Sequence, residues 1–276
     1  MRPISISCLG QTAFACAVAC FILLFISLVM NADSEKNAVL SIVLPVYNEA
    51  ENLRILIPQI EESFPRDTTE IIVVDDGSRD GTPELLDKFN EKYDNVRAIF
   101  RPKLMGIGSA LREGYNIARG EFILSSDADL SFSVADMVLL YRKINEGYDL
   151  VVGCRHCNEA HYEHKSALVR IKYLISKTGN LFVRMITGIA VQDFSANFRI
   201  IRNKVWQKLQ TKEMTNILLF EMVAKTVWGG YRVAQIPVTF SERLFGSSKL
   251  RLWKEAPKFL LKFMYYALAH KIGLGK

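Results

Sequence analysis

The sequence predicts an α/β protein built on a mostly parallel, doubly wound sheet. Short apolar runs of strand length alternate with segments that carry apolar residues at helical spacing, from residue 38 to residue 125. Acidic and polar motifs directly follow several of these apolar runs. Because ligands collect at the carboxyl ends of the strands in such a sheet, the motifs and the alternation indicate the same fold class.

The composition favours one large folded unit. Of the 276 residues, 50% are hydrophobic and 23% are charged, so a sizeable core is possible and wholesale disorder is not expected. The net charge of +6 suits an anionic partner, such as a membrane surface or a nucleotide diphosphate. Because no dense run of Lys and Arg is interleaved with aromatic residues, the sequence argues against a nucleic-acid partner.

The expected elements follow one another along the first half of the chain. Leu53, Leu56, Ile57 and Ile60 recur at helical spacing, whereas the strand runs are short, apolar and bounded by turn residues. The predicted order is strand 38–46, helix 49–62, strand 70–74, helix 83–93, strand 96–100, helix 108–119 and strand 121–125. Beyond residue 160 we expect the same domain to continue with a basic helix, a Gly-bearing loop, a hairpin-like segment over 231–240 and a basic, aromatic tail.

Residues 9–30 carry no charge and are long enough to cross a bilayer core, which takes about 20 apolar residues as a helix. We therefore expect residues 1–36 to form an N-terminal transmembrane anchor and linker. A cleaved signal peptide is the alternative, although its apolar region usually spans about 7–15 residues. No later segment has a comparable uncharged run, so the sequence predicts a single crossing.

The strongest single motif is Asp127-Ala128-Asp129, which follows an apolar strand run. Two carboxylates separated by one small residue at a strand end can converge on one hard cation, Mg²⁺ or Mn²⁺. Such a cation would neutralise a departing diphosphate as a Lewis acid. The alternative is a solvated turn or helix cap, where Asp is common.

A second acidic motif, over residues 75–82, follows the predicted strand 70–74 and begins with Asp75 and Asp76. Acidic side chains and glycines at a strand end can hold ribose hydroxyls or a base edge through hydrogen bonds. A strand–turn–helix junction with an Asp cap gives a similar string, so this motif alone leaves both interpretations open.

Taken in order, Pro45-Val46-Tyr47-Asn48-Glu49, the 75–82 motif and Asp127-Ala128-Asp129 resemble the inverting family 2 glycosyltransferases of GT-A fold. The resemblance covers residues 39–249. It implies a donor nucleoside contacted by Pro45, Tyr47, Glu49, Asp75 and Asp76. It also implies a metal–diphosphate site held by Asp127 and Asp129.

Later motifs resemble one subgroup, the dolichyl-phosphate mannose synthases and related polyprenyl-phosphate glycosyltransferases. The matching strings are residues 153–155, 174–176, 193–199 and 243–249, the last resembling the subgroup's Arg-X-X-Gly-X-Ser-Lys. The resemblance implies a catalytic role at the donor diphosphate for Arg243. It implies an acceptor phosphate bound by Arg155, Arg170, Lys172, Ser176, Arg199 and Lys249, and arginine forks match phosphate geometry.

The acceptor expected from this resemblance is a polyprenyl phosphate. The chain lacks the Gln-X-X-Arg-Trp string of processive polysaccharide synthases. A sugar hydroxyl needs a positioned base, whereas a phosphate is already ionised at neutral pH. The remaining alternatives are a family 2 transferase acting on a glycolipid or polysaccharide hydroxyl, and a non-catalytic subunit that kept the fold.

The donor is less defined by the motifs. GDP-mannose is the first expectation, because the 243–249 string is closest to the mannose enzymes, and UDP-glucose is the second. Three departures from the subgroup bear on the donor: Ile107 replaces a Lys between two glycines, Ser131 replaces a Gln, and Asn197 replaces a Gly.

The implied enzyme would be a single-pass membrane protein with domains 1–36, 37–250 and 251–276, and it could have a small membrane subunit as partner. Arg2 before the apolar run and Asp33, Glu35 and Lys36 after it give a weak bias toward a cytosolic N-terminus. This bias opposes the topology that a nucleotide-sugar enzyme needs, because its donor is normally cytosolic. With so few flanking charges the donor argument takes precedence, and we expect the catalytic domain to face the cytosol. The membrane would be the endoplasmic reticulum in a eukaryote or the inner membrane in a bacterium.

Two further features leave alternatives open. Cys154, Cys157, His161 and His164 could bind zinc, or Cys154 could fill a small buried slot; the five cysteines predict no disulfide framework. In the tail 251–276, Lys254, Lys258 and Lys262 recur among aromatic residues. This amphipathic segment could lie in the membrane interface or pack on the protein, and Pro257 is expected to start its helix.

Overall fold

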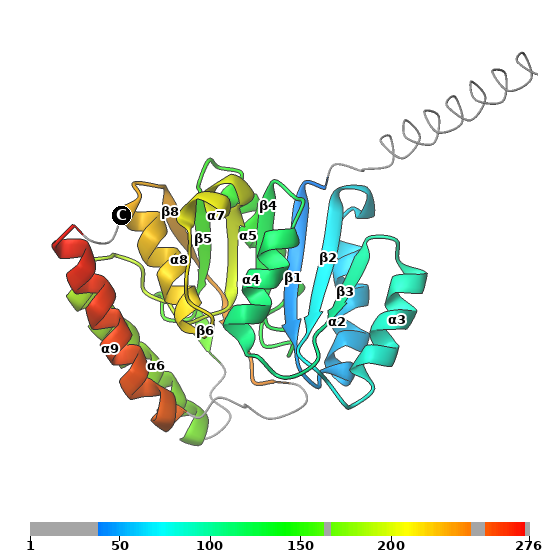
Figure 1. Cartoon of the computed structure of the whole chain (residues 1–276), viewed down its shortest axis with the longest axis horizontal. Helices are drawn as coiled ribbons and strands as arrows, with labels where there is room; N and C mark the ends of the chain where they lie inside the picture. Colours follow the sequence, from blue (N-terminus) through cyan, green and yellow to red (C-terminus); the bar gives the residue numbers. More distant parts are fainter. Residues whose placement is uncertain (1–37, 163–166, 244–251, 274–276) are drawn as a thin grey trace, which may run out of the picture. The chain divides into compact units, whose positions relative to one another are not determined.

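The computed structural model describes residues 38–162, 167–243 and 252–273 (Figure 1). The described residues belong to one compact unit that begins at Ala38. The predicted N-terminal anchor, His164 and Lys249 lie outside them. Within the described ranges, no helix combines the length and apolar character that a membrane crossing requires.

Strands and helices alternate through the first half of this unit, as the sequence predicts. The first half contains β1 (Leu40–Val46), α2 (Ala50–Ser63), the 3-10 turn η1 (Arg66–Thr68), β2 (Thr69–Asp75), α3 (Thr82–Lys92), β3 (Val96–Phe100), α4 (Ile107–Ile117), β4 (Phe122–Ser126) and α5 (Val134–Ile144). The second half contains β5 (Leu150–Cys154), β6 (His161–Tyr162), α6 (Ala167–Thr187), β7 (Phe198–Arg202), α7 (Asn203–Leu209), α8 (Ile217–Trp228), β8 (Val233–Pro237), β9 (Thr239–Phe240) and α9 (Leu252–Lys271).

The main sheet has the strand order β3-β2-β1-β4-β7-β5-β8. Its pairs are parallel except where β7 runs antiparallel between β4 and β5. From β1 the chain first winds outward to β2 and β3, and then returns to the other side of β1 to form β4. In doubly wound sheets this reversal opens a crevice at the carboxyl ends of the two central strands. The fold therefore places the candidate ligand site at the carboxyl ends of β1 and β4.

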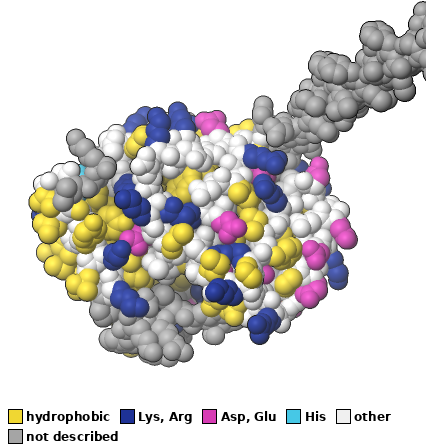
Figure 2. Space-filling view, in the orientation of Figure 1, with side chains coloured by type: hydrophobic (Ala, Val, Ile, Leu, Met, Phe, Trp, Pro, Cys, Tyr) yellow, Lys and Arg dark blue, Asp and Glu magenta, His cyan; other side chains and the backbone are white. Residues whose placement is uncertain are grey.

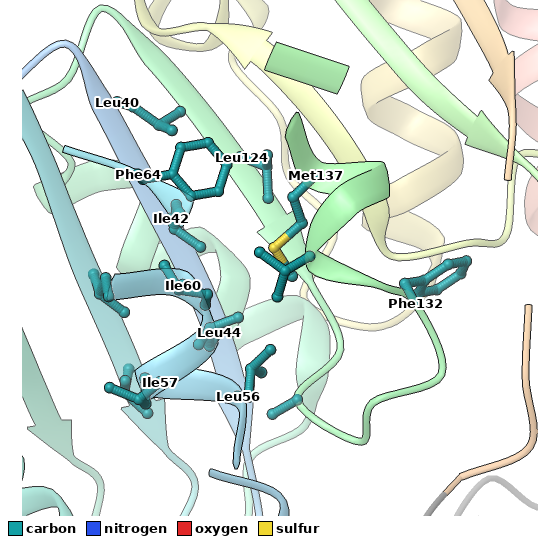
Figure 3. Packing of buried hydrophobic residues seen from close by; sticks show 14 of the residues in the cluster. Leu40, Ile42, Leu44, Leu56, Ile57, Ile60, Phe64, Leu124, Phe132 and Met137 are labelled. Atoms are coloured by element: carbon teal, nitrogen blue, oxygen red, sulfur yellow. The ribbon is translucent and has the colours of Figure 1, made fainter. Parts of the chain in front are cut away.

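Each central strand is buried on both faces, which explains its continuous apolar sequence. Alternate residues of β1 enter different cores: Ile42 and Leu44 join the cluster formed with α2, α3 and α5, whereas Val43 joins the cluster formed with α4, α7 and α8. Figure 3 shows the first cluster, where side chains of α2 lie against those of β1. The resulting three layers hold the strand ends, and thus the motifs, in fixed positions.

The structure corrects two expectations about the second half. The segment 231–240 is not a hairpin, because β8 pairs in parallel with β5 and β9 pairs in parallel with β6. Pro257 lies within α9 rather than at its start. The α/β fold with a mostly parallel sheet is confirmed, with β7 as an antiparallel insertion.

Candidate active site

The carboxyl end of β4 presents the acidic pair. Asp129 is buried and Asp127 is half-buried, with Ala128 buried between them. Leu130 follows with a positive φ of 60°, a conformation that is rare for a side chain branched beyond Cβ. Such backbone outliers concentrate at functional sites, where the surrounding structure holds them in place.

The two carboxyl groups differ in their partners. Asp129 accepts hydrogen bonds at Oδ1 from the backbone and hydroxyl of Ser131, at 3.1 and 2.6 Å. Its Oδ2 lies 2.8 Å from Nε of Arg243. Burial and the adjacent charge of Asp129 raise the pKa of Asp127 to about 7. Close carboxylates repel each other, and a shared divalent cation would relieve that repulsion, so this oxygen-donor pair fits Mg²⁺ or Mn²⁺.

A buried chain of polar groups positions Asp127. Asn197 donates from Nδ2 to Oδ1 of Asp127 at 3.0 Å. The amide oxygen of Asn197 accepts from the hydroxyl of Ser125 at 2.8 Å, and Ser125 in turn accepts from Tyr115 at 2.7 Å. Asn197 is buried and Tyr115 is fully buried. These hydrogen bonds fix the orientation of the Asn197 side-chain amide, so that its N–H group faces Asp127.

The residues predicted to bind the nucleoside lie at the carboxyl ends of β1 and β2. Val46 pairs with Asp75, so residues 45–49 lie beside the second acidic motif. Asn48 has a positive φ of 55°, and its backbone N–H donates to Ser78 at 2.7 Å. The backbone N–H of Glu49 donates to Thr82 at 3.1 Å. These bonds join the first motif, including Pro45 and Tyr47, to the second.

Asp75 and Asp76 both organise loops in this structure. Asp75 accepts from the backbone and hydroxyl of Ser78, and its burial raises its pKa. Asp76 accepts from the backbone N–H groups of Met105 and Gly106 at 2.9 and 2.7 Å, and it pairs with Arg101 at 3.1 Å. The two predicted nucleoside-binding acids therefore also hold the loops that follow β2 and β3.

Arg155 follows β5 and binds Asp193 in a bidentate pair. Its Nε and one terminal nitrogen lie 2.8 and 3.0 Å from the two carboxyl oxygens, and the backbone N–H of Arg155 adds a third bond. Burial alone would raise the pKa of Asp193, but the Arg155 guanidinium holds it well below its usual range. Asp193 thus fixes the position of the Arg155 guanidinium. This positive charge is near enough to Asp127 to offset a small part of the rise in the pKa of Asp127.

The other predicted phosphate ligands are placed differently. Ser176 lies on α6, with its hydroxyl 3.0 Å from Nε2 of His156. Arg170 and Lys172 are exposed near the start of α6. Arg199 is a correction to the predicted set, because its side chain is fully buried and its guanidinium donates to the carbonyls of Phe194, Ala196 and Leu219. The role of Arg199 in this structure is to hold the backbone around Asp193.

Cys154 and Cys157 form a disulfide with each other. This pairing corrects the expectation that the cysteines give no disulfide framework, and it removes both thiolates from the zinc alternative. Cys154 is fully buried, as the other interpretation expected. Among the described side chains, no group of three or more His, Cys, Asp and Glu residues gathers to hold a metal ion.

Arg101, Asp193 and the Tyr115–Ser125–Asn197 chain were not singled out as site residues by sequence reasoning. Asp193 and Asn197 lie within a motif that matched the subgroup, which is a signal that could have found them. Arg101 carries no local signal, because it follows β3 whereas its partner Asp76 follows β2. Tyr115 and Ser125 likewise meet Asn197 only through the fold.

Comparison with known proteins identifies the family of this chain. The family model described as glycosyl transferase family 2 matches residues 41–209, which include both acidic motifs. The chain belongs to glycosyl transferase family 2. It is therefore a glycosyltransferase, and the match extends from the first central strand to α7.

Two relatives within the family cover most of the chain. The polyprenol monophosphomannose synthase of Mycolicibacterium smegmatis is 29% identical over 76% of this chain and 80% of its own length. The undecaprenyl-phosphate 4-deoxy-4-formamido-L-arabinose transferase of Yersinia enterocolitica is 32% identical over 85% of this chain and 68% of its own length.

Solved structures share the fold. Glucosyl-3-phosphoglycerate synthase from Mycobacterium tuberculosis, in complex with Mn²⁺ and uridine diphosphate, gives a TM-score of 0.62 at 17% identity, over 87% of this chain and 81% of that one. The mannosyltransferase PcManGT from Pyrobaculum calidifontis, in complex with GDP-Man and Mn²⁺, gives 0.57 at 18% identity, over 83% of this chain and 64% of that one. These structural similarities show that the chain has an α/β, GT-A-like fold.

Proposed function

We propose that this family 2 glycosyltransferase moves a hexose, with mannose favoured, from a nucleotide-sugar to a polyprenyl phosphate with inversion of the anomeric carbon. The observation that carries the proposal is the setting of Asp127 and Asp129 between two arginines. Arg243 pairs with Asp129, and the charges of Arg243 and Arg155 offset part of the rise that burial and Asp129 cause in the pKa of Asp127. The names of the two relatives support a polyprenyl-linked acceptor.

This arrangement suits a reaction between two phosphates. Asp127 and Asp129 would hold Mg²⁺ or Mn²⁺, which when bound would supply Lewis-acid stabilisation of the departing nucleoside diphosphate. Arg243 and Arg155 carry permanent charges that can bind phosphate oxygens of the donor and the acceptor. A phosphate oxygen needs no proton removed before it attacks, so the site requires no dedicated base.

The donor and location are also proposals. The nucleoside would lie over the joined 45–49 and 75–82 motifs, near Pro45, Tyr47, Glu49 and Asp76. The acceptor phosphate would meet Arg155, with Arg170, Lys172, Ser176 and Lys249 as further predicted ligands. A cytosolic donor requires the catalytic domain to face the cytosol, behind the N-terminal anchor predicted from residues 9–30.

A labelling assay with the full chain in detergent tests the proposal. The protein is incubated with Mg²⁺ or Mn²⁺, dolichyl or undecaprenyl phosphate, and radiolabelled GDP-mannose or UDP-glucose. We expect metal-dependent label in the organic phase with GDP-mannose. Label from UDP-glucose instead would move the donor to the second expectation. Label on a glycolipid or polysaccharide hydroxyl, and none on a lipid phosphate, would contradict the acceptor class.

A further inference from the structure

The first half of helix α6 turns polar side chains inward. Tyr173, Ser176 and Asn180 recur at helical spacing; Asn180 is buried, and the other two are only partly exposed. Large apolar side chains of the same turns are instead 38% to 56% exposed; they are Ile171, Leu174 and Ile175. Hydrophobic side chains gather over the end of the molecule that carries α6 and α9 in Figure 2. Polar groups turned inward need hydrogen-bond partners, so this side of α6 indicates a polar site beneath the helix.

His156 meets this polar side from the loop after β5, where it directly follows Arg155. The residue is 8% exposed, and its Nε2 lies 3.0 Å from the hydroxyl oxygen of Ser176. Its ring centroid lies 5.1 Å from that of Tyr173. The other ring nitrogen, Nδ1, is buried and has no hydrogen-bond partner among the described residues. A buried histidine thus ties the loop that carries Arg155 to the hydroxyl of Ser176.

The His156 ring is neutral at neutral pH. Burial lowers the pKa of His156 to about 4; Asp193 opposes this shift, whereas Arg155 and Lys177 add to it. A neutral imidazole carries one N–H, either on Nδ1 or on Nε2. An N–H on Nδ1 would be a buried donor without an acceptor, which folded proteins rarely contain, whereas an unpaired acceptor is less rare. The N–H is therefore favoured on Nε2, where it donates to Ser176.

This tautomer leaves the hydroxyl hydrogen of Ser176 available. A serine or threonine hydroxyl has one hydrogen to donate, and Thr178 gives its own to carbonyls of α6 at 2.8 and 3.1 Å. Within the described part of the chain, Oγ of Ser176 has two partners instead: Nε2 of His156 and, at 3.5 Å, Nδ2 of Asn180. Both of these nitrogens can donate to Oγ, so its hydrogen remains free for a ligand.

We propose that His156 is a positioning residue, whose Nε2–H holds the Ser176 hydroxyl so that this hydroxyl donates to a phosphate oxygen of the acceptor. This inference deepens the proposed function, on which it rests for the identity of the phosphate. Asp193 already fixes the neighbouring Arg155 through a bidentate pair. The loop after β5 would therefore bring one oriented cation to the acceptor phosphate and orient one hydroxyl toward it.

Transfer kinetics of the full chain in detergent test this role. His156→Phe keeps an aromatic ring but removes the N–H. We expect it to raise KM for the polyprenyl phosphate about tenfold, the scale of one hydrogen bond to a charged group, and to leave KM for the nucleotide-sugar unchanged. His156→Gln, whose amide can donate in place of Nε2, should restore KM to near the wild-type value. Thr178→Ala is the matched control and should change neither constant.

A double-mutant cycle separates positioning from packing. Ser176→Ala should raise KM for the polyprenyl phosphate at least as much as His156→Phe does. Because His156 acts through Ser176, adding His156→Phe to Ser176→Ala should cause no further rise. Effects that multiply, or an equal rise in KM for both substrates, would overturn the proposal.

The tautomer can also be measured without turnover. The chain has four histidines, so isotope labelling of their ring nitrogens gives few magnetic resonance signals, and those lost in His156→Gln belong to His156. We expect these signals to place the N–H on Nε2 and to shift when a short prenyl phosphate is added. An N–H on Nδ1 would overturn the proposal. The expected tautomer and shift, in a protein that transfers no label, would support the positioning role and count against the proposed function.

Discussion

At the scale of single residues, the structure shows how hydrogen bonds orient the carboxylate of Asp127. Asp127 is half-buried beside Asp129, yet it receives a hydrogen bond from Asn197, which lies 70 residues further along the chain. Ser125 and Tyr115 fix the orientation of that amide. Groups that orient a metal ligand commonly matter nearly as much as the ligand itself.

We predict that Asn197→Ala weakens Mn²⁺ binding by about tenfold, since outer partners of metal ligands typically contribute 10–100-fold. Electron paramagnetic resonance of free Mn²⁺ measures this affinity without relying on turnover. Asn203→Ala is the matched control, because Asn203 is a structural amide that bonds the carbonyls of Ala118 and Gly120. Equal Mn²⁺ affinity in folded wild type and Asn197→Ala would contradict the positioning role.

His156 gives a prediction about pH. Burial lowers its pKa from 6.5 to about 4, against the opposing effect of Asp193, and the positive charges of Arg155 and Lys177 lower it further. In the unfolded chain this histidine takes up a proton below pH 6.5, while the folded state does not until about pH 4. Its contribution to stability is therefore present above pH 6.5 and falls by about 3 kcal/mol on acidification to pH 4, at about 1.4 kcal/mol per pH unit.

The measurement compares wild type with His156→Gln by urea unfolding between pH 7 and pH 4. Because other groups titrate over the same range, the difference between the two proteins is the informative quantity. We expect wild type to lose stability relative to the variant as the pH falls. A difference that stays constant with pH would show that the pKa of His156 is the same in the folded and unfolded states, which would contradict the prediction.

At the scale of elements, helix α4 approaches the loop before α8 unusually closely. A Cβ added to Gly108 would overlap the backbone carbonyl of Thr215, whereas a Cβ added to Gly179 on α6 would meet nothing within 4 Å. Gly108 lies two residues after Gly106, whose backbone N–H donates to Asp76. The contact therefore fixes the start of α4, next to the loop that bonds Asp76, as well as the position of the helix.

We predict that Gly108→Ala destabilises the fold by about 1–3 kcal/mol, as overpacking against a rigid backbone does. Gly179→Ala should instead stabilise by about 0.5–1 kcal/mol, because alanine is favoured over glycine within a helix. Thermal unfolding of both variants measures the pair under identical conditions. Similar changes in melting temperature for the two substitutions would show that the loop beside Gly108 moves to accommodate the added methyl group.

At the scale of the whole molecule, the sequence predicted the features that depend on the local pattern of residues. Alternating apolar runs predicted the order of elements from β1 to β4, and the acidic motifs were expected at strand ends, which is where they lie, at the ends of β2 and β4. Pairings between distant segments gave no such signal: β8 joins β5 rather than forming a hairpin. Arg199 matched a phosphate-binding motif, but burial in the fold made it a structural residue.

The central claim, that Asp127 and Asp129 support metal-dependent transfer to a lipid phosphate, is tested most directly by Asp129→Asn in the labelling assay. Asp87→Asn, an exposed acid on α3, is the matched control. The account predicts that Asp129→Asn lowers label in the polyprenyl product by at least about a hundredfold in Mn²⁺, because the substitution removes a charged ligand of the metal. The control should label like wild type. Equal labelling by Asp129→Asn and wild type would contradict the account.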